Sequence, residues 1–149
     1  MSIVKEALAG TLDFTKLDGD DWMYLLRKHL QFADHCDWSK LNGYNWANLL
    51  CAQLQFADHC DWSKLDRHDW TYLLREQPQF ADHCTQYVFE HRCGDIKRTI
   101  YINIDKPMLI HIGCFEGTEE EAISAINKEY SGQAATDYIS KVKSCFAKL

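Results

Sequence analysis

The sequence predicts a mainly α-helical protein, in which a short α-solenoid of three stacked helical repeats is followed by a small α+β cap domain. The first observation is a 24-residue unit that occurs three times without gaps, at residues 13–36, 37–60 and 61–84. The second is the spacing of apolar residues by three and four within each unit, which is typical of an α-helix. The third is a change to alternating apolar residues after residue 84, which is typical of β-strands.

The three copies are identical at 12 of their 24 positions. The shared residues lie in the DWSKL segment, in a Trp-x-x-Leu-Leu run and throughout QFADHC. A unit of this length cannot bury its own apolar face, and neighbouring units bury it jointly. The period therefore indicates a stacked array.

Residues 1–12 are expected to form an N-terminal capping helix, because the terminal units of an array need a cap. Ser2 is the expected N-cap and Gly10 the expected stop. The packing face of this helix is predicted to comprise Ile3, Val4, Ala7 and Leu8.

Each repeat is predicted to contain one clear α-helix, with Asp18, Asn42 or Asp66 as its N-cap. The Trp and the two Leu that follow it by three and four residues form the core-facing stripe. Pro78 stands where the other copies have Leu, and Pro is tolerated at the first position of a helix. QFADHC is therefore expected to belong to a second short helix, and DWSKL to the return between units.

Residues 85–149 are predicted to form an α+β domain with antiparallel strands and two helices. Strands are expected at 85–91, 97–105 and 108–114, with a turn at 92–95. Thr118 and Glu121 predict a capping box for the first helix, which is expected to stop near Gly132. The apolar faces are predicted to comprise Ile100, Ile102 and Ile104; Met108, Ile110 and Ile112; and, in the last helix, Tyr138, Ile139, Val142, Cys145 and Phe146.

The charge of the chain is acidic and uneven. Residues 1–84 carry 8 Lys and Arg against 13 Asp and Glu, a net charge of -5, whereas residues 85–149 carry 8 against 9. This balance disfavours nucleic acid, whose binding depends on neutralising phosphates, and favours a protein partner with a basic surface. Seven cysteines, an odd number, and an N-terminus without a long apolar core predict reduced thiols in the cytoplasm. No segment has transmembrane length, so no membrane is expected as a partner.

The His-Cys pair that ends each copy resembles a metal-binding pattern. Zinc ligands must converge at roughly 2 Å from the ion, whereas equivalent positions in stacked helices lie about 8–10 Å apart. We therefore expect neither a metal nor a cofactor here, and predict that Cys fills a small buried space while Asp and His form hydrogen bonds. The pairs are His35-Cys36, His59-Cys60 and His83-Cys84.

His91, Cys93, His111 and Cys114 supply the residue types of a cysteine nucleophile and its base. His111 and Cys114 are three residues apart on a predicted strand and should point to opposite faces of the sheet. Cys93 falls in the predicted turn. The sequence therefore predicts no catalytic residues, and we expect no enzymatic activity.

The copies differ mainly on the helix face opposite the Trp-Leu-Leu stripe. One interpretation is an extended surface with aromatic and arginine anchors for a protein partner. The alternative is that exposed positions vary because nothing constrains them. The varied positions are Asp20, Tyr44 and His68; Tyr24, Asn48 and Tyr72; and Arg27, Cys51 and Arg75.

Two further hypotheses stay open. A small ligand or nucleotide would bind between the repeats and the C-terminal domain, through Lys97, Arg98 and Tyr101. A structural protein would self-assemble into homo-oligomers, because stacked repeats with unsealed ends can associate.

The repeat DWSKL(N/D)G..W..LL....QFADHC resembles tandem repeats of uncharacterised bacterial and phage-encoded proteins. The segment IHIGCFEGTEEEAISAINKEYSGQAATDYISKV resembles a small C-terminal module that accompanies such repeats. The resemblance implies a prokaryotic or phage origin and brings no catalytic residues. By analogy it implies an inhibitor that occupies a host protein, such as a component of antiviral defence.

Overall fold

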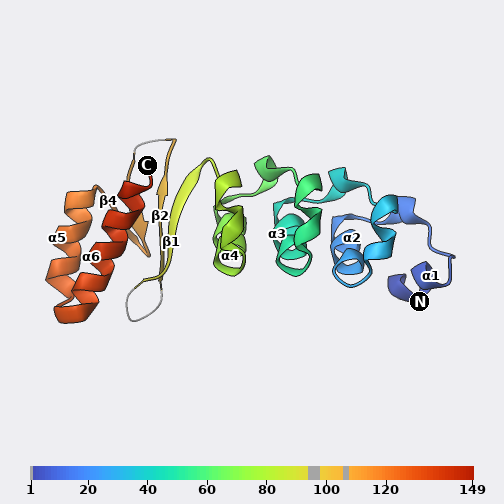
Figure 1. Cartoon of the computed structure of the whole chain (residues 1–149), viewed down its shortest axis with the longest axis horizontal. Coiled ribbons are helices and arrows are strands. Elements are labelled where there is room, and N and C mark those ends of the chain that lie inside the picture. Colours follow the sequence, from blue (N-terminus) through green and yellow to red (C-terminus); the bar gives the residue numbers. More distant parts are fainter. Residues whose placement is uncertain (1, 94–97, 106–107) are drawn as a thin grey trace. The chain divides into compact units, whose positions relative to one another are not determined.

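The computed structural model describes residues 2–93, 98–105 and 108–149. The chain forms two compact units, Met1–Ala81 and Asp82–Leu149, which we call the N-terminal and C-terminal units (Figure 1). The protein is mainly helical, and the C-terminal unit combines a four-stranded antiparallel sheet with two helices. Within the described ranges, no helix is long and apolar enough to cross a membrane.

The N-terminal unit repeats one order of elements: a three-residue 3-10 turn, an α-helix and a six-residue 3-10 helix. Each α-helix packs on the next one along the chain. The α-helices are α1 (Ile3–Leu8), α2 (Gly19–Leu26), α3 (Gly43–Ala52) and α4 (Arg67–Glu76). The opening turns are η1 (Phe14–Lys16), η3 (Trp38–Lys40) and η5 (Trp62–Lys64), and the closing helices are η2 (Leu30–His35), η4 (Leu54–His59) and η6 (Pro78–His83).

The predicted N-caps of α2, α3 and α4 are confirmed, and each belongs to a reciprocal capping box. In α3, Asn42 accepts a hydrogen bond of 2.9 Å from the backbone N–H of Asn45, and the Asn45 side chain accepts one of 3.0 Å from the backbone N–H of Asn42. The exchange satisfies two backbone donors at the start of the helix. Asp18 with Asp21 and Asp66 with Asp69 make the same box.

The predicted Trp-Leu-Leu stripe is also confirmed, since all nine of its side chains are buried. The DWSKL segment adds its leucine to this core, and its Trp38 ring stacks on Trp46 with 5.5 Å between ring centroids. The stripe comprises Trp22, Leu25 and Leu26; Trp46, Leu49 and Leu50; and Trp70, Leu73 and Leu74.

The prediction for α1 is confirmed at its N-cap and wrong on its packing face. Ser2 holds the N-cap position, but its side chain makes no capping hydrogen bond. Leu8 is exposed, and only Ala7 of this helix is buried, because a helix of six residues presents less than two full turns to its neighbour.

The QFADHC helix does begin at Pro78 as expected, but it is a 3-10 helix, in which the Phe80 N–H donates to the carbonyl three residues before it.

The sheet of the C-terminal unit runs in the order β1-β2-β3-β4, with every neighbouring pair antiparallel. Its strands are β1 (Tyr87–Cys93), β2 (Arg98–Asn103), β3 (Ile110–Ile112) and β4 (Phe115–Gly117). β4 is missing from the sequence prediction, which extends the third strand through Cys114. The structure ends β3 earlier because Gly113, with a φ of 61°, turns the chain into a tight hairpin with Cys114.

Alternate residues of the sheet pack against α5 (Glu119–Glu129) and α6 (Gly132–Ala147). Ile100, Ile102, Ile110 and Ile112 are buried as predicted, but Met108 is exposed because β3 begins only at Ile110. The predicted apolar face of α6 is confirmed: Tyr138, Val142 and Cys145 are buried, and Ile139 and Phe146 pack beside them.

The first of the two last helices ends near Gly132 as predicted, and Gly132 itself opens the second helix. The Thr118 capping box is confirmed, with Glu121 as its partner. α5 ends at Glu129, and Gly132 begins α6 with a φ of 62°.

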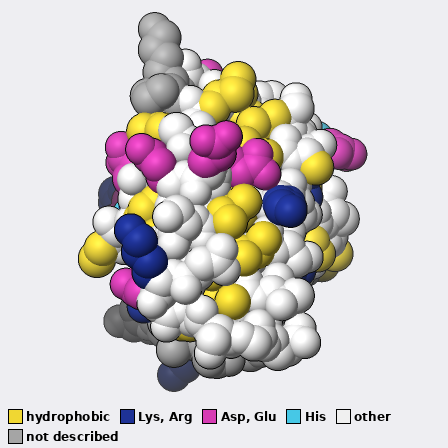
Figure 2. Space-filling view, turned by 90° about the vertical axis from the view of Figure 1, so that its left-hand side faces the viewer, with side chains coloured by type: hydrophobic (Ala, Val, Ile, Leu, Met, Phe, Trp, Pro, Cys, Tyr) yellow, Lys and Arg dark blue, Asp and Glu magenta, His cyan; other side chains and the backbone are white. Residues whose placement is uncertain are grey.

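In the space-filling view of Figure 2, apolar side chains lie across the middle of the visible face, with acidic and basic side chains around them.

Candidate functional site

The residues that all three copies share are engaged in folding. In the DWSKL segment, Asp37 Oδ1 accepts hydrogen bonds from the backbone N–H (3.2 Å) and the hydroxyl (2.6 Å) of Ser39. The corresponding pairs are Asp13 with Thr15 and Asp61 with Ser63. These hydrogen bonds hold the pKa of all three carboxyl groups below the usual value. The shared Asp is therefore a structural residue.

The shared lysine binds the preceding copy. Lys64 Nζ donates hydrogen bonds of 2.9 Å each to the carbonyl oxygens of Ser39 and Leu41. Lys40 Nζ donates likewise to the carbonyls of Thr15 (2.9 Å) and Leu17 (2.6 Å). Lys16 has no copy before it, and it forms an exposed ion pair with Asp13 in its own copy instead.

A glutamine makes a second link of the same kind. Gln53 Nε2 donates to the Arg27 carbonyl at 2.7 Å, and Gln77 Nε2 donates to the Cys51 carbonyl at 3.2 Å. The first copy has His29 at this position. The position therefore carries glutamine in the two copies that have a full copy before them.

Two glycines mark where one copy meets the next. A Cβ added to Gly43 would lie 2.3 Å from Lys64 O and 2.3 Å from Asp69 Oδ2, and one on Gly19 would lie 2.5 Å from atoms of the second copy. No such approach is tolerated by real side chains, so these positions require glycine. The third copy has Arg67 there. Sequence reasoning missed this signal, which lies in the replacement of glycine by arginine in the last copy alone.

The His-Cys pairs have a packing role that differs from the expected hydrogen bonding. The His59 ring stacks on Trp38 at 4.4 Å between ring centroids, and the His35 ring stacks on Phe14 at 4.5 Å. Burial raises the pKa of the thiols of Cys36 and Cys60 to about 12, and it also raises the pKa of Cys84. The thiolate that metals bind is thereby disfavoured. Across the described residues, no group of three or more His, Cys, Asp or Glu is placed to hold a metal ion.

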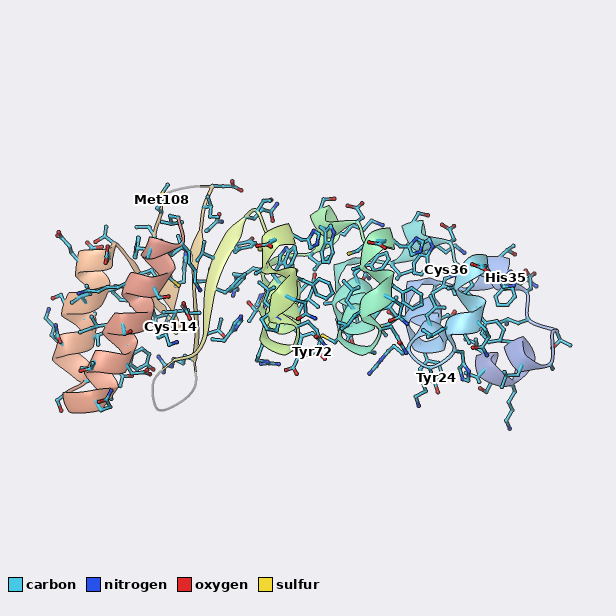
Figure 3. The ribbon with its side chains drawn as sticks, in the orientation of Figure 1. Tyr24, His35, Cys36, Tyr72, Met108 and Cys114 are labelled. Carbon is cyan, nitrogen blue, oxygen red and sulfur yellow. The ribbon has the colours of Figure 1, made fainter. Side chains whose placement is uncertain are left out.

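Three tyrosines stand out among the varied positions. Tyr24 is 54% exposed, Tyr44 is 59% exposed and Tyr72 is 36% exposed. Arg27 and Arg75 are also exposed, one helical turn further along, and Arg75 Cζ lies 5.7 Å from the centre of the Tyr72 ring. Figure 3 shows Tyr24 and Tyr72 on the same side of the N-terminal unit. We call these five residues the tyrosine face.

Two of the other varied positions, Asp20 and Asn48, have side chains engaged in hydrogen bonds, whereas His68 is exposed. Asp20 accepts a hydrogen bond of 2.6 Å from Asn45 Nδ2 in the next copy, so it belongs to the contact between copies. Asn48 is half-buried, and its Nδ2 donates to the Tyr44 carbonyl at 2.9 Å. His68 is exposed at the start of α4, with its Nε2 3.1 Å from Arg67 Nη2.

The candidate catalytic residues of the C-terminal unit have separate surroundings. His111 Nδ1 lies 3.5 Å from Glu116 Oε2, and the His111 ring stacks on Tyr101 at 4.5 Å between ring centroids. Cys114 is exposed in the β3–β4 turn and not on a strand as predicted (Figure 3). Cys93 was predicted to lie in a turn, but it ends β1, and its backbone pairs with that of Arg98 in β2. Residues 94–97, the rest of the predicted turn and the residues after it, lie outside the described part of the chain.

Of the three residues predicted to bind a small ligand, the two that the structure describes lie on opposite faces of the sheet. Lys97 lies outside the described residues. Arg98 and Tyr101 are three residues apart in β2, so their side chains point to opposite faces of the sheet. Arg98 lies on the helix-covered face with Ile112, whereas Tyr101 stacks on His111 on the other face.

Glu90 in β1 was not recognised as a site residue from the sequence. It accepts a hydrogen bond from the Ser144 hydroxyl, and its carboxylate lies 2.7 Å from Lys148 Nζ and 3.6 Å from Lys141 Nζ. Burial by itself would raise the pKa of Glu90, but the hydrogen bonds and charges of these α6 residues outweigh burial and lower the pKa. The cluster joins β1 to α6, and we assign it a structural role.

Comparison with known proteins adds no identification: no family model, no curated protein and no solved structure matches this chain.

Proposed function

We propose that this chain is a non-enzymatic protein-binding module, in which the three copies stack as a short solenoid and bind a protein partner through the tyrosine face. The observation that carries the proposal is the exposure of Tyr24, Tyr44 and Tyr72 on helices whose shared residues are engaged in folding. Tyrosine and arginine are the residue types that dominate the binding energy of protein interfaces. Large aromatic side chains left exposed on three consecutive helices are therefore better explained by binding than by stability.

The stacked arrangement is supported by contacts that recur from copy to copy. The lysine of DWSKL donates to two carbonyl oxygens of the preceding copy, and a glutamine donates to a third. Such nearest-neighbour contacts are typical of solenoid repeats, which present extended surfaces to their partners.

The partner that fits this module is a protein with a basic surface. Residues 1–84 carry a net charge of -5, from 8 Lys and Arg against 13 Asp and Glu. Charge of this sign accelerates encounter with a basic surface and repels nucleic acid. Six described cysteines are free thiols, which supports a reducing compartment such as the cytoplasm.

The first experiment is capture of partners from a lysate of the native host with the tagged full chain, at low and at physiological salt. A variant carrying Tyr24→Ala, Tyr44→Ala and Tyr72→Ala is expected to lose at least 90% of any stoichiometric partner, since hot-spot truncations commonly cost about 2 kcal/mol or more. Its stability should change little, because the side chains are exposed.

The matched control removes two other exposed apolar side chains of the same unit. Leu30 is 42% exposed and Leu54 is 44% exposed, and both lie on the closing 3-10 helices away from the varied helix positions. A Leu30→Ala, Leu54→Ala variant should retain the partner. The proposal fails if the triple tyrosine variant keeps the same partners, or if the leucine variant loses them equally.

The resemblance of the repeat to phage-encoded proteins extends the proposal to an inhibitor that occupies a bacterial host protein, such as an antiviral defence component. The test is phage plating on a defence-positive bacterial strain that expresses the chain. Wild-type protein should raise the plating efficiency, and the triple tyrosine variant should not. If wild-type protein and the triple tyrosine variant gave the same plating efficiency, the inhibitory role would be excluded, and the proposal of a binding module would stand without it.

A further inference from the structure

The C-terminal unit contains a pocket between its sheet and its two helices. The space has a volume of about 80 Å³, and it is lined by residues of β2, β3, β4, α5 and α6. The pocket thus lies wholly within one compact unit. It is also independent of the tyrosine face, which belongs to the N-terminal unit.

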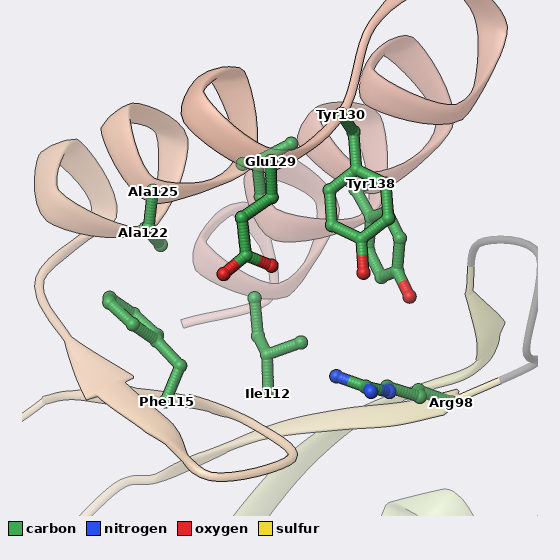
Figure 4. A pocket seen from close by; sticks show the side chains of 9 residues that line it. Arg98, Ile112, Phe115, Ala122, Ala125, Glu129, Tyr130 and Tyr138 are labelled. Atoms are coloured by element: carbon green, nitrogen blue, oxygen red, sulfur yellow. The ribbon is translucent and has the colours of Figure 1, made fainter.

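The floor of the pocket is apolar and its rim carries opposite charges. Ile112 and Phe115 contribute to the floor from the sheet, and Arg98 and Glu129 approach from different elements. Figure 4 shows the Arg98 guanidinium and the Glu129 carboxylate directed toward the same space from opposite sides. The hydroxyl groups of Tyr130 and Tyr138 point toward the sheet on the Arg98 side of this space.

The two charged groups are available to a ligand. Neither Arg98 nor Glu129 forms an ion pair or side-chain hydrogen bond with another residue in the part of the chain that the structure describes. Arg98 is held beside the β3–β4 turn, where its Nη1 lies 3.0 Å from the position that a Cβ on Gly113 would take. Glycine at this turn therefore leaves room for the guanidinium at the edge of the pocket.

From this geometry we propose that the pocket binds a free α-amino acid with an apolar side chain. Arg98 binds the carboxylate, since the guanidinium is the preferred partner of carboxylates in proteins. Glu129 binds the ammonium group, and Ile112 and Phe115 contact the side chain. A simple fatty acid would leave Glu129 next to a second carboxylate, and a simple amine would leave Arg98 next to a second cation. The zwitterion gives both Arg98 and Glu129 a partner of opposite charge.

The test is isothermal titration calorimetry of the full-length chain with L-leucine and with three analogues that each lack one feature. The analogue 4-methylpentanoate lacks the ammonium group, isoamylamine lacks the carboxylate, and glycine lacks the side chain. Leucine is expected to bind roughly tenfold or more tightly than each analogue, because each loses one charged or apolar contact. Absence of leucine binding at 10-millimolar ligand, or equal binding of leucine and 4-methylpentanoate, would overturn the proposal.

Variants distinguish this pocket from binding elsewhere on the chain. Arg98→Met and Glu129→Gln should each weaken leucine binding roughly tenfold or more. The matched controls Glu120→Gln in α5 and Lys143→Gln in α6 change exposed charges outside the pocket lining and should leave the affinity within twofold. Thermal unfolding confirms that all four variants fold. Leucine binding that survives both pocket variants unchanged would exclude this site.

Discussion

The contacts that stabilise each unit internally join residues at different separations along the chain. In the N-terminal unit, the lysine and glutamine contacts between copies join residues 23, 25 or 26 positions apart. In the C-terminal unit, Ser144 reaches Glu90 across 54 positions and Lys148 reaches the Phe89 carbonyl across 59. The first unit is thus built from contacts between neighbours, and the second from one core that closes only when its last helix is in place. A destabilising substitution should therefore reduce protection from hydrogen exchange in a different set of elements in each unit.

The largest expected effect comes from Trp46→Ala in α3, because Trp46 is fully buried. Loss of a buried tryptophan costs about 3–5 kcal/mol. Hydrogen exchange measured by mass spectrometry should show lost protection in α2, α3 and α4, since α3 packs on both other helices. The strands β1 and β2 should keep theirs.

The matched variant in the other unit is Ile100→Ala, which removes a fully buried side chain of the sheet. It should cost about 2–5 kcal/mol and lower protection throughout β1–β4, α5 and α6. Protection in α3 should not change. If either variant lowered protection equally in both units, the units would unfold together and the comparison would be wrong.

The next effect tests the close contact between copies. Gly43→Ala places a methyl group against the Lys64 carbonyl and the Asp69 carboxylate, and it should destabilise the protein by about 1–3 kcal/mol. The control is Arg67→Ala, at the same repeat position in the last copy, which should change stability by no more than about 0.5 kcal/mol. Urea unfolding of both variants gives the comparison. An equal effect at the two positions would show that contact with a following copy does not dictate the glycine.

Much of this fold follows from the sequence, because its determinants are local. The capping boxes of α2–α4 and the Trp-Leu-Leu stripe depend on residues within one turn or two of each other. The alternation of Ile100 and Ile102 indicates a strand with one buried face for the same reason. β4 was missed because three residues are too few to show a period, and its pairing depends on the turn at Gly113.

The candidate sites were harder to predict, because they depend on which elements lie next to each other. The link from Asp20 to Asn45 and the requirement for glycine at position 43 appear only when one copy is packed on the next. Arg98 and Tyr101 are a different case: their odd spacing on a strand already places them on opposite faces. The pocket of Arg98 and Glu129 brings together β2 and α5, a pairing that no short-range pattern indicates.

A smaller effect is expected for the lysine that binds the preceding copy. Lys64→Met removes two hydrogen bonds to backbone carbonyls and should cost roughly 1–2 kcal/mol, since such charge-assisted bonds are modestly stabilising when partly exposed. Lys16→Met is the control, because Lys16 forms an exposed ion pair within its own copy and, among the described residues, makes no hydrogen bond to another copy. The two variants are compared by urea unfolding. Similar losses in both would mean that the lysine acts within its copy and not between copies.

The smallest effect concerns acid stability of the C-terminal unit. The pKa of Glu90 is lowered in the folded state, so its contribution to stability is present above the unfolded value of 4.5 and is lost as the pH falls through the folded value. Glu90→Gln should lower stability at pH 7 by at most about 1 kcal/mol and flatten the loss of stability below pH about 4.5. Thermal unfolding between pH about 3 and 7 measures this, with Glu120→Gln as a control on an exposed carboxylate. A Glu90→Gln variant with the wild-type acid profile would show that the ion pairs of Glu90 with the lysines of the C-terminal segment do not stabilise this unit.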